Sequence, residues 1–81
     1  MKSVTIYSTP TCTYCNLAKD FFKENNVEYT EHNVAEDADR RNEMIEKSGQ
    51  MGVPVIVFSD DAGEDLVVGF NEAKVREQLG L

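Results

Sequence analysis

The pattern of apolar positions changes period early in the chain. The β-favouring residues Val4, Ile6 and Tyr7 predict a strand over residues 3–7. Pro10 then ends regular strand pairing. Apolar residues next recur every three or four positions, which predicts a helix from about residues 11–13 to residues 25–26. Its apolar positions are Tyr14, Leu17, Ala18, Phe21 and Phe22.

Three further segments follow. Residues 27–34 alternate and predict a half-exposed strand at a sheet edge. Residues 36–48 are strongly polar and predict a helix that lies on one sheet face and stops at Gly49. Its sparse apolar side is Ala38, Met44 and Ile45. Pro54 opens an apolar strand and leaves the backbone of Val53 available for other pairing, although the spacing does not decide between a cis and a trans bond.

The last third of the chain predicts a β-hairpin and a helix. Residues 59–63 form a polar loop that ends in glycine, and residues 66–68 resume as a strand. Asn71 is a good N-cap for a helix over residues 72–79, which packs through Val75 and Leu79. The element order is therefore β-α-β-α-β-β-α. This order predicts one α/β domain over residues 1–81, with a four-stranded mixed sheet flanked by helices.

Composition narrows the possible partners. The chain has 81 residues and a formal net charge of −7. This charge argues against nucleic acid or an anionic membrane as partner, because both are negatively charged and bind basic patches on proteins. Met1 is followed directly by residues of the predicted strand, so we expect no leader sequence, and no apolar run is long enough to span a bilayer. We therefore expect a cytoplasmic protein whose cysteines stay mostly reduced.

The only two cysteines, Cys12 and Cys15, lie where the first strand gives way to the first helix. A thiolate at a helix N-terminus accepts unpaired backbone N–H groups and feels the helix dipole, worth about 0.3 to 2 kcal/mol. Cys15, one turn inside the helix, should be less exposed. The pattern favours redox chemistry in which Cys12 attacks a disulfide and Cys15 resolves the mixed disulfide.

Two other interpretations of the cysteine pair are weaker. A structural disulfide closing a loop of about four residues would contribute only about 2 kcal/mol in the chain-entropy model, against about 3 for fifteen residues. A zinc site needs about four ligands, and beyond the cysteines the chain offers one histidine, His32, so carboxylates or a second chain would have to complete it. We predict no metal site and interpret His32 as a solvated strand residue. Arg40 and Arg41 are interpreted as solvated or paired, with anion binding as the lesser alternative.

The chain resembles the glutaredoxins over essentially its whole length. The features that carry the resemblance are, in chain order, Val4-Thr5-Ile6-Tyr7, Cys12-Thr13-Tyr14-Cys15, Leu17-Ala18-Lys19, Arg41-Asn42-Glu43-Met44-Ile45, Ser48-Gly49, Val53-Pro54 and Gly69-Phe70. The resemblance implies a thioredoxin-like (glutaredoxin) fold and a thiol–disulfide oxidoreductase that reduces protein disulfides or glutathione mixed disulfides. It also implies a cis Pro54 facing Cys12, with the Val53 backbone pairing with the substrate.

The same resemblance implies a binding site around the reactive sulfur. Its substrate- or glutathione-binding residues would be Thr11, Tyr14, Val53, Pro54, Gly69, Phe70 and Asn71. No tightly bound cofactor is implied, and glutathione would be a co-substrate. The expected partners are disulfide-containing client proteins and an electron donor, either glutathione or thioredoxin reductase, and the protein would act as a monomer.

Several positions depart from the glutathione-dependent pattern. Thr9 stands where many members have a lysine or arginine, and Asn71 stands where they have the first of two acidic residues. Thr13 replaces the usual proline between the cysteines, and Gly52 replaces a threonine. The Gly69-Phe70 pair looks more like the subgroup reduced by thioredoxin reductase. Two other functions stay open: delivery of an iron–sulfur cluster by a dimer that bridges it through Cys12 and glutathione, and a redox-inert interaction domain.

Overall fold

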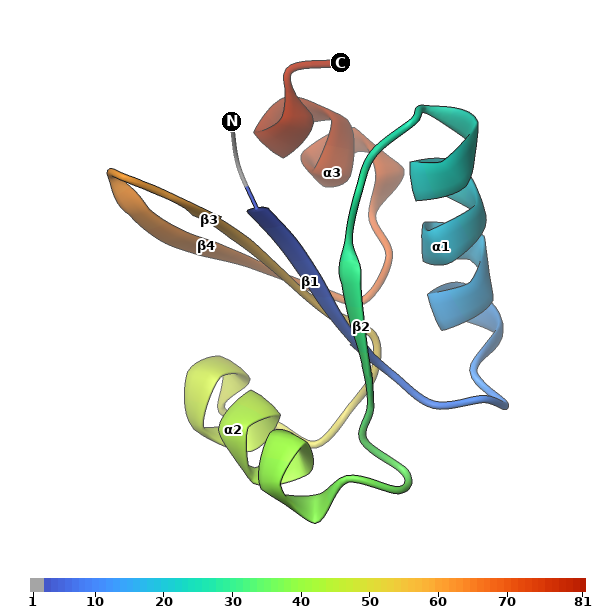
Figure 1. The fold of residues 1–81 in the computed structure, drawn as a ribbon, viewed down its shortest axis with the longest axis vertical. Coiled ribbons are helices and arrows are strands. Elements are labelled where there is room, and N and C mark those ends of the chain that lie inside the picture. The colour runs from blue at the N-terminus through green and yellow to red at the C-terminus, as the bar shows by residue number, and fades with distance from the viewer. Residues whose placement is uncertain (1–2) are drawn as a thin grey trace.

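A computed structural model describes residues 3–81 of the chain as an alternation of strands and helices in the predicted order (Figure 1). The elements are β1 (Ser3–Ser8), α1 (Thr13–Glu24), β2 (Thr30–Asn33), α2 (Ala38–Ser48), β3 (Val55–Asp60), β4 (Gly63–Val68) and α3 (Glu72–Leu79). The predicted order β-α-β-α-β-β-α is confirmed. The predicted helix over residues 72–79 matches α3 residue for residue.

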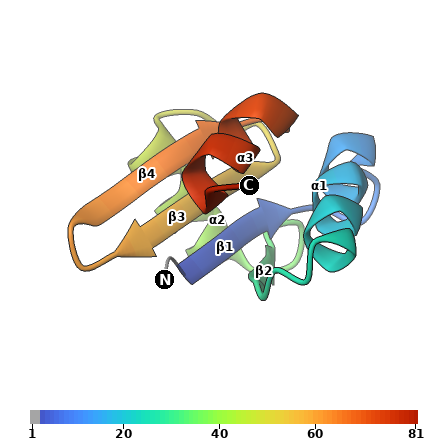
Figure 2. The ribbon, with the colours of Figure 1, turned by 90° about the horizontal axis from the view of Figure 1, so that it is seen from above.

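The four strands form one mixed sheet in the order β2-β1-β3-β4. β1 runs parallel to β2 and antiparallel to β3, and β4 returns antiparallel to β3. Strand β2 therefore lies at a sheet edge, as its alternating pattern predicted. Viewed from above, α1 and α3 lie on one side of the sheet and α2 lies on the other (Figure 2).

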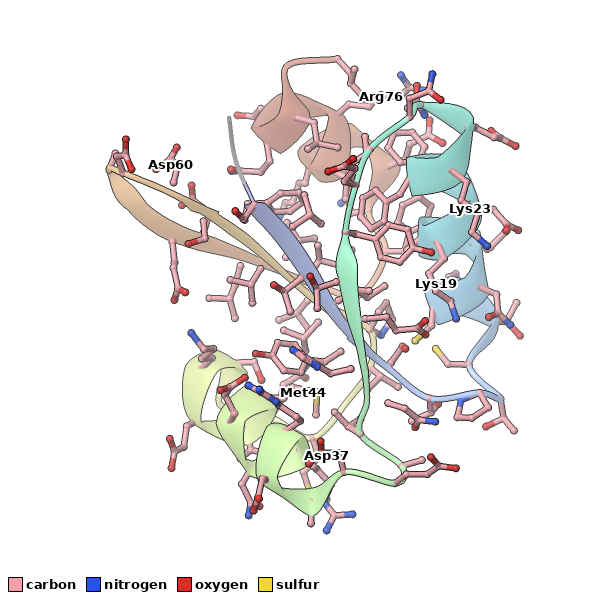
Figure 3. All side chains as sticks on the ribbon, in the orientation of Figure 1. Lys19, Lys23, Asp37, Met44, Asp60 and Arg76 are labelled. Atoms are coloured by element: carbon pink, nitrogen blue, oxygen red, sulfur yellow. The ribbon has the colours of Figure 1, made fainter. Side chains whose placement is uncertain are left out.

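The core consists of two layers because helices cover both sheet faces. Strand β3 is buried along Val55, Ile56, Val57 and Phe58, so it is apolar on both faces rather than alternating. The layer beneath α1 and α3 contains Val4, Ile6, Ala18, Phe21, Phe22, Ile56, Phe58, Val67 and Val75. The layer beneath α2 contains Tyr7, Val34, Met44, Val55 and Val57. Met44 on α2 is labelled in Figure 3.

Polar side chains define where the later helices begin. Asp37 caps α2 by accepting the backbone N–H of Arg40 at 3.1 Å, and Asn71 caps α3 by accepting that of Lys74 at 3.3 Å. Gly49, at φ 74°, ends α2 in the left-handed conformation that glycine adopts without steric cost. The predicted stop at Gly49 and the predicted cap at Asn71 are both confirmed.

The predicted apolar face of α1 was wrong at its N-terminal end. Tyr14 and Leu17 are exposed, at 62% and 47% of their surface, whereas Cys15 and Ala18 are fully buried. The helix is rotated so that its buried residues are Cys15, Ala18, Phe21 and Phe22, whereas Tyr14 and Leu17 remain exposed. A spacing of three or four residues allows Tyr14 and Leu17 on the buried face, so only the packing of α1 on the sheet decides their exposure.

Other boundaries also differ from the prediction: β2 covers only Thr30–Asn33 of residues 27–34, and α2 begins at Ala38 and not at residue 36. The loop expected over residues 59–63 is shorter, because Ser59 pairs with Glu64 and Asp60 with Gly63 across the hairpin. Strand pairing is a property of the backbone, so the ladder continues beyond the last apolar side chain. Ala38, expected on the buried side of α2, is exposed and is the first residue of that helix.

Candidate active site

Cys12 occupies the N-cap position of α1, as the sequence predicted. Its backbone is extended, and its sulfur accepts a hydrogen bond from the backbone N–H of Cys15 at 3.2 Å. The loop before it is held by the Cys12 N–H, which donates to the Thr9 carbonyl at 3.3 Å. One unpaired donor of the helix start is thus directed at the Cys12 sulfur, which is the contact that stabilises a thiolate there.

Cys15 differs from Cys12 in exposure, although both are free thiols. Cys12 is partly exposed and Cys15 is fully buried. Burial raises the pKa of Cys15 to about 12, and its hydrogen bond with Cys12 also raises it. The expectation that Cys15 is the less exposed thiol is confirmed. The pair therefore combines one accessible sulfur with one that is shielded and protonated.

The segment before β3 lies against the Cys12 sulfur. The Val53-Pro54 bond is cis, as the resemblance implied. The Cys12 thiol makes a weak hydrogen bond to the Val53 carbonyl, with the two atoms 3.9 Å apart. The Pro54 carbonyl in turn accepts the backbone N–H of Gly69 at 2.8 Å. The fold thus links the cysteine loop, the start of β3 and the turn after β4.

The remaining predicted binding residues differ in exposure. Thr11 and Tyr14 are exposed beside Cys12 in the chain, and Gly69 is half-buried. Phe70 packs against the core with its ring centroid 5.8 Å from that of Phe21. The Asn71 side-chain oxygen is already used to cap α3. Their contacts with a substrate stay predictions.

Comparison with known proteins identifies the family. The family model for glutaredoxin matches residues 4–62, which is most of the chain. The chain belongs to the glutaredoxin family. A glutaredoxin-like protein from the rubredoxin operon of Clostridium pasteurianum, itself uncharacterised, is 42% identical over 89% of this chain and 91% of its own. Glutaredoxin 3 of Escherichia coli K12 is 39% identical over 69% of this chain and 68% of its own.

Solved structures support the same fold. The thioredoxin-like protein BC3987 aligns with a TM-score of 0.81 and 32% identity, covering 94% of this chain and 99% of its own. A glutaredoxin from Archaeoglobus fulgidus aligns with a TM-score of 0.78 and 28% identity, covering 98% of this chain and 87% of its own. The predicted thioredoxin-like fold is confirmed, and family membership supports a thiol–disulfide oxidoreductase type of function. Within residues 3–81, no helix is long and apolar enough to cross a membrane.

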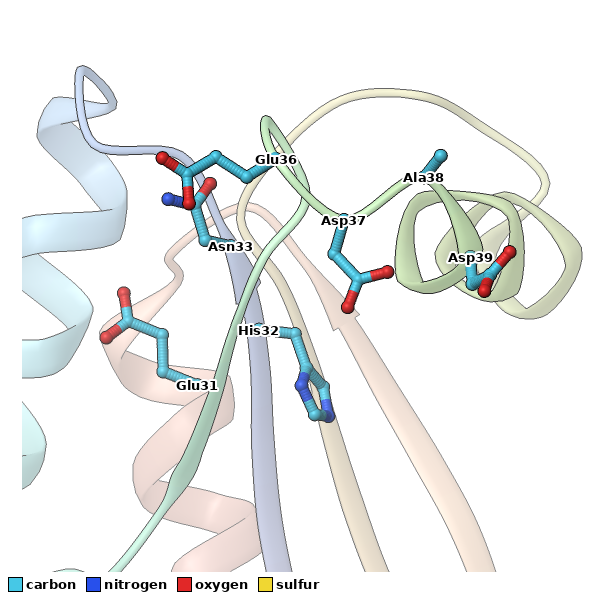
Figure 4. A pocket seen from close by; sticks show the side chains of 7 residues that line it. All are labelled: Glu31, His32, Asn33, Glu36, Asp37, Ala38 and Asp39. Atoms are coloured by element: carbon cyan, nitrogen blue, oxygen red, sulfur yellow. The ribbon is translucent and has the colours of Figure 1, made fainter.

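A pocket of about 480 Å³ lies next to β2, and neither cysteine of this glutaredoxin lines it (Figure 4). Its lining residues are Glu31, His32, Asn33, Glu36, Asp37, Ala38 and Asp39. In the described part of the chain, no three acidic, histidine or cysteine side chains are grouped closely enough to hold a metal ion. His32 was interpreted as a solvated strand residue; it is only partly solvated, because it is half-buried with its ring centroid 5.5 Å from that of Tyr7. Arg40 is paired with Glu43 at 3.1 Å, one of the two expected states.

Sequence reasoning missed one group of residues near Cys15. Ser8, the last residue of β1, is almost fully buried and donates its hydroxyl to Glu31 at 2.7 Å. The same Glu31 oxygen lies 2.7 Å from the Lys19 ammonium. The sequence feature that could have indicated this group is the position of Lys19, four residues after Cys15 on the same predicted helix.

Proposed function

We propose that this glutaredoxin is a dithiol oxidoreductase, in which Cys12 is the nucleophile and Cys15 is the resolving thiol. The proposal rests on the difference in exposure between the two cysteines, which lie within one helical turn. The partly exposed Cys12 sulfur accepts a backbone N–H at the start of α1, while Cys15 is completely shielded. Only Cys12 can therefore meet a large disulfide substrate first.

The first step is attack on the substrate disulfide. The Cys12 thiolate forms a bond to one substrate sulfur, the substrate S–S bond breaks, and the departing sulfur leaves with the electron pair and takes a proton from solvent. The half-buried Val53 backbone, whose carbonyl lies 3.9 Å from the Cys12 sulfur, is suited to pair with an extended substrate segment. Such pairing would align the substrate sulfur with Cys12.

The second step is resolution by Cys15. Contact with Cys12 is among the causes that raise the pKa of Cys15, through a hydrogen bond and through charge repulsion. Both causes disappear once Cys12 is in a mixed disulfide, because its sulfur then carries no proton and no charge. Cys15 then loses its proton more easily and attacks the Cys12 sulfur. A Cys12–Cys15 disulfide forms, and the second substrate thiol leaves with the electron pair.

The roles of the two cysteines are tested by substitution. Cys12→Ser should abolish reduction of a protein disulfide, and surviving activity would contradict the assignment. Cys15→Ser should accumulate a stable mixed disulfide with the substrate, visible by mass spectrometry, while sparing any cycle that uses glutathione alone. Leu17→Ala, at an exposed position of α1, is the control and should keep full activity.

The electron donor completes the cycle by reducing the Cys12–Cys15 disulfide. We propose glutathione as co-substrate or a thioredoxin-reductase-type flavoprotein as donor, with Thr11, Tyr14, Val53, Pro54, Gly69, Phe70 and Asn71 lining the binding site. Position 9 carries no cation, and the Asn71 side chain is committed to its helix cap. Both features weaken recognition of the charged ends of glutathione and favour the flavoprotein.

The donor is tested with NADPH, a disulfide substrate and two reducing systems. One contains glutathione with glutathione reductase, and the other contains thioredoxin reductase alone. Turnover only with thioredoxin reductase is the expected result. Turnover only with the glutathione system would mean that Thr9 and Asn71 still serve a glutathione site, and turnover with neither would contradict the oxidoreductase proposal.

We further propose that the protein acts as a cytoplasmic monomer without a tightly bound cofactor. The alternative, in which two chains and glutathione hold an iron–sulfur cluster through Cys12, makes a different prediction. Protein purified without air would then be coloured, contain iron and elute as a dimer. A colourless, iron-free monomer is the result expected for the oxidoreductase.

A further inference from the structure

A chain of polar contacts lies beside the buried resolving thiol. Cys15 and Lys19 are one turn apart on α1, so their side chains share one side of the helix. Glu31 and His32 are neighbours on β2, and Figure 4 shows Glu31 turned toward α1 and His32 turned the opposite way. Lys19 is labelled on α1 in Figure 3. Helix and strand therefore bring a cation and an anion together on the Cys15 side of the sheet.

The Lys19 side chain is held in place by a carboxylate that is itself hydrogen-bonded to the sheet. Its ammonium lies 2.7 Å from a Glu31 oxygen, and its side chain is only 18% exposed. The Ser8 hydroxyl donates to the same oxygen at 2.7 Å, and Ser8 is 1% exposed. Because a buried serine anchors the carboxylate, the ion pair is fixed to the sheet.

Charges on several elements face this group. The Glu31 carboxylate raises the pKa of Lys19, while the Lys19 ammonium and the Ser8 hydroxyl lower the pKa of Glu31, so both are charged at neutral pH. Tyr29, just before β2, also raises the pKa of Lys19, and Lys23, one turn further along α1, also lowers the pKa of Glu31. The Lys19 charge also acts on Cys15, where it opposes the effect of burial on the thiol pKa.

Resolution requires a thiolate in a place that disfavours charge. Cys15 is fully buried, and burial is the largest cause of its raised pKa. A cation fixed nearby lowers the cost of forming the thiolate. Lys19 is the cation that the fold places one turn from Cys15 on the same helix side.

We infer that Lys19, held by Glu31 and Ser8, is a positioning residue that sets the rate at which Cys15 resolves the mixed disulfide. This inference rests on the proposed function and adds a control element to it. Cys15 gives its proton to solvent and its thiolate attacks the Cys12 sulfur. The mixed disulfide bond breaks, and the leaving sulfur departs with the electron pair.

The test isolates the resolution step. Reduced protein is mixed with the aromatic disulfide dithiobis(nitrobenzoate), which releases one coloured thiolate when Cys12 is modified and a second when Cys15 attacks. The rate of the second release is followed by stopped-flow absorbance from mildly acidic to neutral pH. The leaving group is the same for every variant and needs no proton, so the rate reports the protonation of Cys15.

Lys19→Met should slow the second release about tenfold at each pH, which corresponds to a thiol pKa higher by about one. The loss arises because the cation on the Cys15 side of α1 is removed and the Glu31 carboxylate loses its partner. The double variant Lys19→Met/Glu31→Gln also removes the unpaired carboxylate and should recover part of the rate. Lys19→Arg should keep it. If Lys19 had only a structural role, adding Glu31→Gln would not be expected to restore the rate of the second release.

The control is Lys47→Met, which removes an ion pair of the same kind, to Glu64 at 2.9 Å, between α2 and β4. Its rate of second release should equal that of the unmodified protein. A Lys19→Met rate equal to that of the unmodified protein, or a double variant slower than Lys19→Met alone, would overturn the inference. If instead the unmodified protein releases only one thiolate, or Cys15→Ser still releases two, the proposed function itself fails.

Discussion

At the scale of single residues, the protein assigns opposite environments to two chemically identical side chains. Cys12 lies in a partly exposed cap, with its sulfur accepting a backbone N–H. Cys15 lies in the core and stays protonated because burial disfavours its thiolate. The N-cap position supplies the backbone N–H to Cys12, and the packing of α1 on the sheet shields Cys15.

Stability at alkaline pH should report the buried thiol. The pKa of Cys15 rises from 9.0 when unperturbed to about 12 in the folded protein. The native state therefore retains a proton that the unfolded chain has lost, and this contribution, complete below pH 9, disappears as the pH rises toward 12. The free energy of unfolding should fall in that window, by at most about 1.4 kcal/mol per pH unit from this group.

Urea unfolding at a series of pH values measures the effect. Cys15→Ala should flatten the alkaline fall, although it lowers stability at neutral pH by removing a buried sulfur. Tyr7 contributes in the same direction, because burial and its hydrogen bond to Glu43 raise its pKa, so Tyr7→Phe is the second variant. An alkaline slope identical in Cys15→Ala and the unmodified protein would show that the folded state does not hold Cys15 protonated.

At the scale of elements, α3 begins at a residue with two candidate roles. Asn71 caps the helix through its side-chain oxygen, and the family resemblance places the same residue in the binding site. The two roles make separable predictions, because a cap can be replaced by another capping side chain.

Asn71→Ala should lower the free energy of unfolding by about 0.5 to 2 kcal/mol, whereas Asn71→Ser should restore most of it. The measurement is urea unfolding, with Asn42→Ala, an exposed asparagine inside α2, as the matched control. If Asn71→Ser is stable but has lost activity with the electron donor, Asn71 also contacts substrate. Equal stability of Asn71→Ala and the unmodified protein would contradict the cap.

At the scale of the whole molecule, two core layers share one sheet. Strand β3 contributes Ile56 and Phe58 to the layer under α1 and α3, and Val55 and Val57 to the layer under α2. The second layer is the thinner one, and Met44 is the only residue of α2 that is fully buried. The attachment of α2 to the sheet therefore depends strongly on one side chain.

Met44→Ala should lower the free energy of unfolding by about 2 to 5 kcal/mol, because it leaves a cavity between α2 and the sheet. Met51→Ala is a matched control, since the same substitution is made where the side chain is 72% exposed, and it should change stability by no more than about 0.5 kcal/mol. Denaturant unfolding measures both. Similar losses for the two variants would contradict the packing described for α2.

The sequence by itself determined the order and type of the elements, the place of Cys12 at a helix start and the cap at Asn71. These depend on interactions between residues a few positions apart, such as a change from period two to period three or four, or a side chain that bonds the next turn of backbone. The same locality explains why Cys15 was expected to be the shielded thiol.

The tertiary structure determined the contacts between segments that are distant in the sequence. The contact between Cys12 and the Val53 carbonyl and the group of Ser8, Lys19 and Glu31 each connect different elements. No local pattern encodes them, because they depend on strand order and on how α1 is rotated on the sheet. That rotation also exposes Tyr14, which the spacing alone had placed on the apolar face of the helix.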